Sequence, residues 1–159
     1  SQLWIVLALG ALVVGWLVVP RLFPTETRIR WALEDAIESF NAARAGGVVA
    51  PLANDWYDRS TRATKDAVRG YLAALFLRKE NRHGGRFRYQ AEAIEESWRI
   101  QASGESADVS VRVQFRDARE AEGSEPLWTI DVTASLEERD REWLITRSGF
   151  EKVSGERPF

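Results

Sequence analysis

Five side chains in this sequence are candidates for an acid, a base or an oxyanion donor: Asp55, Tyr57, Tyr71, His83 and Asp131. A carboxylate in an apolar pocket can serve as a general base, and a tyrosine beside it can stabilise a developing oxyanion. Each side chain also has an ordinary explanation. The tyrosines suit core positions with a wet hydroxyl. Asp55 suits a turn or a helix cap, Asp131 suits a pair with an arginine on a neighbouring strand, and His83 suits a solvated loop. We therefore expect no catalytic residue.

A second acidic group, Glu34, Asp35 and Glu38, falls within a predicted helix. A carboxylate pair can do acid–base work, but a solvated helix face explains this group better. The chain contains no cysteine and one histidine, so metal sites built on thiolates or imidazole clusters are not expected. It also lacks a phosphate-binding glycine-rich loop and a nucleophile elbow. We predict neither a metal nor a cofactor.

Charge is distributed unevenly along the chain. Residues 58–88 contain nine basic and three acidic side chains, whereas residues 89–159 contain nine basic and sixteen acidic ones. Such asymmetry bears on partners rather than on fold. The predicted basic patch, facing either anionic lipid or an acidic partner subunit, consists of Arg59, Arg62, Lys65, Arg69, Arg78, Lys79, Arg82, Arg86 and Arg88. Part of it is also explained by cations at a helix C-terminus. Nucleic acid is disfavoured because the rest of the domain is acidic.

The first twenty residues contain no charged side chain. A transmembrane helix needs about 20 mainly apolar residues, so the sequence predicts a single-pass anchor over residues 1–23. Trp4, Trp16 and Arg21 are expected at the membrane interfaces. A cleaved signal peptide would need a basic leading region and a small-x-small cleavage site, and neither pattern is present. The anchor is therefore expected to be retained.

Small residues follow one face of the predicted anchor at Ala8, Ala11 and Gly15. Such a stripe allows close packing against another helix, although alanine and glycine are also common in membrane helices generally. The positive charges after the anchor favour a domain on the cytoplasmic side of a bacterial inner membrane.

Helical spacing of apolar residues predicts three helical segments in residues 24–159. The first opens at Thr25 or Thr27 and ends at Gly46 and Gly47, where glycine commonly closes a helix. A short helical piece over residues 48–53 follows. The third segment opens at Thr64, and residues 81–85 after it form a loop by composition.

The apolar period then changes to two, which is typical of half-buried strands. The pattern predicts four strands, over residues 87–101, 109–116, 128–136 and 143–153. Helices followed by a meander of strands indicate an α+β domain with a four-stranded antiparallel sheet.

The chain resembles the nuclear-transport-factor-2-like superfamily over residues 26–153. The resemblance rests on the element order, on the Asn54-Asp55-Trp56-Tyr57-Asp58 stretch and on the closing Trp143-Leu144-Ile145-Thr146-Arg147 strand. It implies two to three helices cupped against a curved sheet to form a cone. The superfamily contains isomerases, cyclases and dehydratases as well as non-catalytic transport and assembly domains, so the fold does not decide the function. Its isomerases have a donor tyrosine on the first helix, where this sequence has only Trp31 and Phe40 as aromatic residues.

The leading hypothesis is a non-catalytic, membrane-anchored accessory or scaffold subunit that binds and stabilises a larger membrane complex of photosynthetic, respiratory or secretion type. The alternative is a membrane-tethered small-molecule binder, or an isomerase or dehydratase, that uses the cone as its pocket. A third hypothesis is a homodimer formed through the exposed sheet face, with Arg112, Gln114 and Arg116 opposite Thr129, Asp131 and Thr133.

Overall fold

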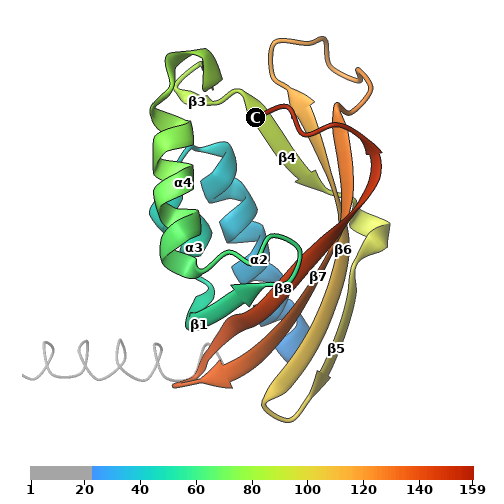
Figure 1. The fold of residues 1–159 in the computed structure, drawn as a ribbon. Helices are drawn as coiled ribbons and strands as arrows, with labels where there is room; N and C mark the ends of the chain where they lie inside the picture. Colours follow the sequence, from blue (N-terminus) through green and yellow to red (C-terminus); the bar gives the residue numbers. More distant parts are fainter. Residues whose placement is uncertain (1–22) are drawn as a thin grey trace, which may run out of the picture.

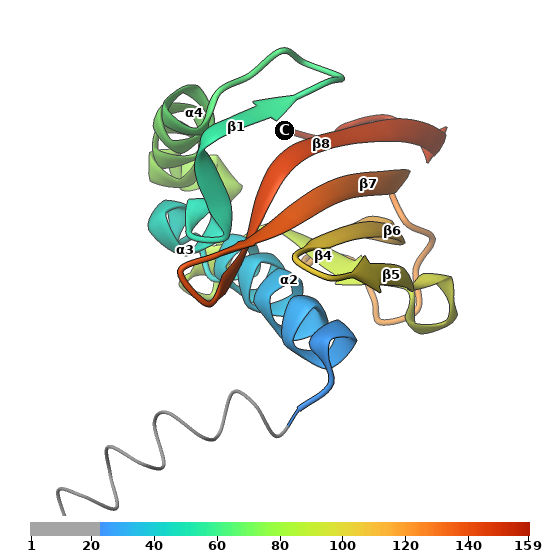
Figure 2. The same cartoon turned by 90° about the horizontal axis from the view of Figure 1, so that it is seen from below.

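The computed structural model describes residues 23–159. They form an α+β domain in which three α-helices cover one face of a strongly curved six-stranded sheet (Figures 1 and 2). Within these residues, no helix is long and apolar enough to cross a membrane. The predicted anchor over residues 1–23 lies almost wholly outside the described part, as do all the side chains predicted for its packing stripe and its interfaces: Ala8, Ala11, Gly15, Trp4, Trp16 and Arg21.

The first helix ends earlier than its glycines suggested. α2 (Thr25–Asn41) starts directly after Pro24 without a side-chain cap, and α3 (Ala45–Val49) follows as a separate short helix. Gly46 and Gly47 therefore lie inside α3 and do not close α2. A Cβ atom at Gly47 would clash with the Ser39 side chain, so this glycine permits α3 to approach α2 closely.

The third helix begins where the sequence predicted. α4 (Lys65–Leu77) is capped by Thr64, whose hydroxyl accepts a hydrogen bond from the Ala67 N–H at 3.4 Å. The predicted loop over residues 81–85 is instead a 3-10 turn, η2 (Lys79–Asn81), and a small hairpin of β2 (Arg82–His83) and β3 (Arg86–Phe87). Both residues of its tight turn, Gly84 and Gly85, have positive φ angles, which two-residue hairpins of this kind require.

The main sheet has six strands, not the predicted four. The order runs β1–β8–β7–β6, and β4 and β5 both pair with β6 along its far edge. The bounds are β1 (Leu52–Asp58), β4 (Tyr89–Ala93), β5 (Arg99–Ser103), β6 (Ser106–Asp117), β7 (Trp128–Arg139) and β8 (Glu142–Gly155).

Two features explain the difference in strand number. A 3-10 turn, η3 (Glu95–Ser97), divides the predicted strand over residues 87–101 into β4 and β5. In addition, β1 replaces the later part of the short helical piece predicted over residues 48–53, and it runs parallel to β8. The sheet is therefore mixed rather than purely antiparallel.

The concave face of the sheet and the helices enclose the core. Inward positions of β6 and β7 are apolar, as the period of two predicted, and most of them are buried. Aromatic rings fill the middle. The ring of Phe40 on α2 lies with its centroid 5.0 Å from that of Phe87, 5.7 Å from that of Phe76 and 5.8 Å from that of Phe115. Phe87 itself is 0 % exposed. The interior of the cone is thus the hydrophobic core of the domain.

Asn41 holds the end of α2 against the sheet. Its buried amide donates to the Ala91 carbonyl at 2.9 Å and accepts from the Ala91 N–H at 2.6 Å. The side chain therefore pairs with the free edge of β4 as a neighbouring strand would. Phe40 is the preceding residue, so the same contact fixes where its ring enters the core.

Replacing Phe87 by alanine should lower the free energy of unfolding by about 3–5 kcal/mol, because it removes a buried ring at the centre of the core. The matched control is Leu77→Ala, at an apolar residue that is 81 % exposed, and it should change stability by no more than about 0.5 kcal/mol. Urea unfolding followed by far-ultraviolet circular dichroism measures both. Similar losses for the two variants would contradict a core centred on Phe87.

Candidate functional site

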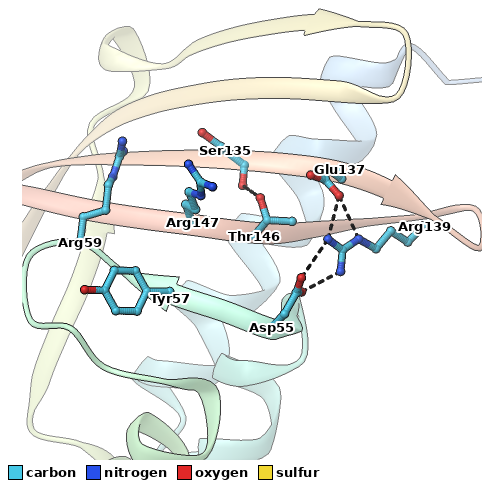
Figure 3. Close-up of a pocket in the computed structure, with 8 residues that line it drawn as sticks. All are labelled: Asp55, Tyr57, Arg59, Ser135, Glu137, Arg139, Thr146 and Arg147. Atoms are coloured by element: carbon cyan, nitrogen blue, oxygen red, sulfur yellow. Dashed lines mark hydrogen bonds and ion pairs between the residues drawn. The ribbon is translucent and has the colours of Figure 1, made fainter.

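A groove of about 710 Å³ lies on the outer, convex face of the sheet, away from the helices (Figure 3). Positions along β1, β7 and β8, together with the residue that follows β1, supply its walls: Asp55, Tyr57, Arg59, Ser135, Glu137, Arg139, Thr146 and Arg147. These side chains point outward because the intervening residues of the same strands face the core. A register shift in the β7–β8 pairing skips Thr146. Its hydroxyl donates to the Ser135 carbonyl at 3.2 Å.

One end of the groove is closed by ion pairs. Arg139 Nη1 donates to Asp55 Oδ1 at 2.7 Å, and Arg139 Nη2 donates to Glu137 Oε2 at 2.8 Å. The Arg139 guanidinium holds the pKa of Asp55 below its usual range. Asp55 therefore remains a carboxylate paired across to β7. It lies within β1, not at the turn or helix cap that its residue type suggested, and it is poorly suited to serve as a general base.

The other end of the groove holds cations that lack an acidic partner. Arg59 Nη2 donates to the Thr133 hydroxyl at 3.3 Å. Within residues 23–159, neither Arg59 nor Arg147 forms an ion pair. Tyr57 stands on the same face and is 41 % exposed. Two guanidinium groups beside hydroxyl donors are suited to bind a carboxylate or a phosphate.

The polar surface continues beyond this groove across β7 and β6. A second hollow of about 330 Å³ shares Arg59 and Ser135 with the first and adds Arg99 and Asp108. Ser135 donates to Asp108 at 2.8 Å, whereas the Arg99 guanidinium donates only to backbone carbonyls. Arg99 is thus a third cation of the outer face without an ion pair among the described residues.

The predicted pairing of Asp131 with a neighbouring arginine is confirmed. Arg112 lies opposite Asp131 in the β6–β7 register and binds it through two hydrogen bonds of 2.7 and 2.9 Å. The Arg112 guanidinium lowers the pKa of Asp131. In the same register, Gln114 lies opposite Thr129. Thr133 lies opposite Ser110 and not opposite any of the three β6 residues predicted to face it.

The nine residues of the predicted basic patch do not share one role. Arg59 is the member that lines the outer-face groove. Four others bind groups of their own domain: Lys65 reaches the Leu52 carbonyl, Arg82 reaches the Phe76 and Gly85 carbonyls, Arg86 pairs with Glu38, and Arg88 pairs with Asp117. The remaining four are exposed: Arg62, Arg69, Arg78 and Lys79. Whether they face a lipid or a partner stays a prediction.

The tyrosine candidates are not core residues. Tyr57 is 41 % and Tyr71 is 49 % exposed, so neither occupies the buried position that its type suggested. His83 is exposed in the β2–β3 hairpin. Of the helical acids, Glu34 pairs with Arg30 at 2.7 Å and Glu38 with Arg86 at 2.9 Å, while Asp35 is exposed. Among residues 23–159, no three acidic or histidine side chains are grouped so as to hold a metal ion.

The sequence analysis did not identify two buried carboxylates, those of Asp58 and Asp117. Asp58 accepts hydrogen bonds from the N–H and the hydroxyl of Thr61, each at 2.8 Å, and from the Ser148 hydroxyl at 2.9 Å. Asp117 accepts from Arg88 Nε at 2.8 Å and from the Arg119 N–H at 3.0 Å. An aspartate whose carboxylate oxygens accept hydrogen bonds from the residues two or three positions later stabilises a turn. Neither carboxylate has the free, apolar surroundings of a general base.

No protein-family model matches the sequence, and no curated protein matches it either. Solved structures are similar. They include a protein of unknown function with a cystatin-like fold from Nostoc punctiforme, at TM-score 0.65 and 11 % identity, covering 84 % of this chain and 93 % of that one. An NTF2-like protein of unknown function from Pseudomonas putida matches at TM-score 0.62 and 14 % identity, covering 84 % and 96 %.

The domain has the nuclear-transport-factor-2-like, cystatin-like cone fold. A candidate scytalone dehydratase from Novosphingobium aromaticivorans shares it at TM-score 0.61 and 16 % identity, covering 81 % of this chain and 84 % of that one. The TM-scores establish the fold, whereas sequence identities this low leave the activity open.

Asp117 should contribute to the pH dependence of stability. Arg88 lowers the pKa of this carboxyl in the folded state, so the stabilisation is complete above the unfolded-state pKa of about 3.9 and is lost as the pH falls through the lower folded-state value. Asp117→Asn should lower the free energy of unfolding at pH 7 by about 1–3 kcal/mol, and the difference from the wild type should shrink below about pH 4.

The matched control for this prediction is Asp131→Asn. Asp131 also pairs with an arginine, but both side chains are 45 % exposed, whereas the Asp117 side chain is 5 % exposed. Solvent screens the exposed pair, so its loss should cost less. Urea titrations at several pH values measure both variants, and an equal cost at pH 7 would contradict the assigned role of burial.

Proposed function

We propose that this chain is a non-catalytic accessory subunit that binds a partner protein through the outer face of its sheet. The observation that supports this most directly is the division between the two faces. The concave face is filled by aromatic rings, whereas the convex face has a groove with cations that lack ion-pair partners among residues 23–159. The packed cone can thus serve as a scaffold, while its exterior binds the partner.

An isomerase or dehydratase that uses the cone gains no support from the described residues. Such an enzyme needs an ionisable group at the base of an apolar pocket. Here the buried acids Asp58 and Asp117 are both engaged by hydrogen-bond donors. The isomerase donor position on the first helix has no tyrosine, and Phe40 of that helix packs into the aromatic core.

The chemistry of the groove favours an acidic segment of the partner. Arg59 and Arg147 offer planar donor groups that match carboxylates in two-point hydrogen bonds. Tyr57 adds a phenolic hydroxyl from β1, whereas the hydroxyls of Ser135 and Thr146 already donate within the sheet. The ion-paired end with Asp55 and Glu137 would repel a uniformly acidic chain, and this restricts the acidic contact to the Arg59 end.

The proposal that this partner belongs to a membrane complex is based on the N-terminal sequence of the chain. The uncharged stretch over residues 3–19 has the length and composition of a membrane span, and α2 starts at Thr25, only a few residues beyond it. The domain of a chain anchored in this way would lie close to the bilayer, where subunits of a membrane complex are accessible to it.

The test compares two charge reversals. Arg147→Glu places a carboxylate in the groove, and Arg69→Glu makes the same change at an exposed arginine of α4 in the sequence-predicted basic patch. We expect Arg147→Glu to weaken binding of a diglutamate peptide, which is short enough to contact the Arg59 end alone, at least about tenfold, because a charge-assisted hydrogen bond is worth about 1.5–3 kcal/mol. Arg69→Glu should bind like the wild type. Chemical-shift titration measures the affinities.

The same two variants should differ in the proteins with which they co-purify from native membranes. The wild type and Arg69→Glu should co-purify with the same partner subunits from mild detergent, and Arg147→Glu should lose them. If only Arg69→Glu loses the partner subunits, the binding surface would be the basic patch of α4 and not the outer face. Recovery of the wild type only as a homodimer, lost in Arg147→Glu, would assign the outer face to self-association.

A further inference from the structure

The second hollow of the outer face, of about 330 Å³, is lined by two of the cations that lack an ion pair. Strand register places four residues in one row across β8, β7, β6 and β5: Gly149, Thr133, Ser110 and Arg99. Arg59 reaches the same row from the segment after β1, because its Nη2 donates to the Thr133 hydroxyl at 3.3 Å. The hollow thus combines two arginine side chains with the hydroxyl group of Ser110.

Gly149 allows Arg59 to cross β8. A Cβ atom at this glycine would lie 3.7 Å from both Cβ and Nε of Arg59, so the arginine side chain passes directly over it. The segment is fixed to β8 on either side: the Arg59 N–H donates to the Ser148 carbonyl at 2.7 Å, and the Ser60 hydroxyl accepts from the Phe150 N–H at 2.7 Å. Arg59 is therefore held across the strands (Figure 3).

The charge of the hollow is positive. Within residues 23–159, neither Arg59 nor Arg99 forms an ion pair. Arg99 Nη1 donates to two backbone carbonyls of its own turn, at 2.9 and 2.8 Å, which leaves its Nε and Nη2 for another acceptor. Among the described residues that line the hollow, Asp108 is the one acid, and it accepts a hydrogen bond from Ser135 at 2.8 Å.

These groups fit a phosphomonoester better than a carboxylate. A phosphorylated side chain has a charge of about −1.5 to −2 at pH 7 and three strong acceptor oxygens. It can therefore accept hydrogen bonds from Arg59, Arg99 and Ser110 together, whereas a carboxylate has two oxygens and a single charge. The repulsion from Asp108 also offsets a larger share of the attraction for the singly charged group.

We propose that this hollow binds a phosphorylated serine or threonine of the partner segment that occupies the groove. The identity of this carrier rests on the proposed function. The hollow and the groove share Arg59 and Ser135, so one segment can contact both. The row of Arg147 and the row of Thr133 are two residues apart, about 6.6 Å, which is also the rise of two residues in an extended segment. Phosphorylation of the partner therefore strengthens its binding.

The test titrates the full chain, held in phosphatidylcholine nanodiscs, with the capped tripeptide acetyl-Gly-phosphoserine-Gly-amide. Phosphorus NMR measures the affinity of the wild type, of Arg99→Gln and of the matched control Arg69→Gln, at an exposed arginine of α4. We expect the wild type and the control to bind equally and Arg99→Gln to bind at least about tenfold more weakly, because it loses charge-assisted hydrogen bonds. Gly149→Val should weaken binding similarly, since its side chain blocks the path of Arg59.

The diglutamate peptide separates this proposal from the proposed function. Arg99→Gln should bind it like the wild type. Equal phosphopeptide affinities for the wild type and Arg99→Gln, with diglutamate binding still dependent on Arg147, would overturn the phosphate site alone. Phosphopeptide binding that depends on Arg99, with diglutamate binding that does not depend on Arg147, would keep the phosphate site and contradict the proposed function. Capture of phosphatidic acid vesicles through Arg99, without phosphopeptide binding, would assign the hollow to lipid and overturn the proposal.

Discussion

Edge-to-face packing of aromatic rings under the curved sheet is the interaction on which the rest of the domain depends. Curvature brings the inward side chains of β6 and β7 toward one another, and the helices must cover what remains apolar. Phe40 does this from the last turn of α2, with its centroid 5.0 Å from that of Phe87. Asn41, the next residue, binds the free edge of β4. One turn of helix thus fixes both the core and the helix–sheet angle.

Filling the cone has a consequence for where binding can occur. A pocket inside would have to displace rings, whereas the convex face needs no rearrangement to receive a partner. Its ion pairs, such as Arg112 with Asp131, are about half exposed, and pairs of this kind contribute little to stability. The outer face can therefore change its charge pattern without loss of the fold. Proteins that share the cone can accordingly differ in what they bind.

The sequence predicted the α+β class, the start of α4 and the outward position of Asp131, because these follow from strict apolar periods or from a capping residue. The cone fold was predicted from the family resemblance alone. It missed β1, whose Asn54 and Asp55 are poor strand formers and whose pairing with β8 is distant in sequence. It also read 87–101 as one strand, since nothing local marks the turn at η3. The groove could not be predicted from the sequence either, because only the register of the strands brings Arg59, Ser135 and Arg147 close together.

We propose that the outer face of the sheet, and not the helical face, contacts the partner. Photo-crosslinking in native membranes tests it most directly, with p-benzoylphenylalanine placed at Tyr57 of the groove or at Leu77 of α4, which are 41 % and 81 % exposed. We expect a defined adduct with another protein from position 57 and none from position 77. An adduct from position 77 alone would contradict it.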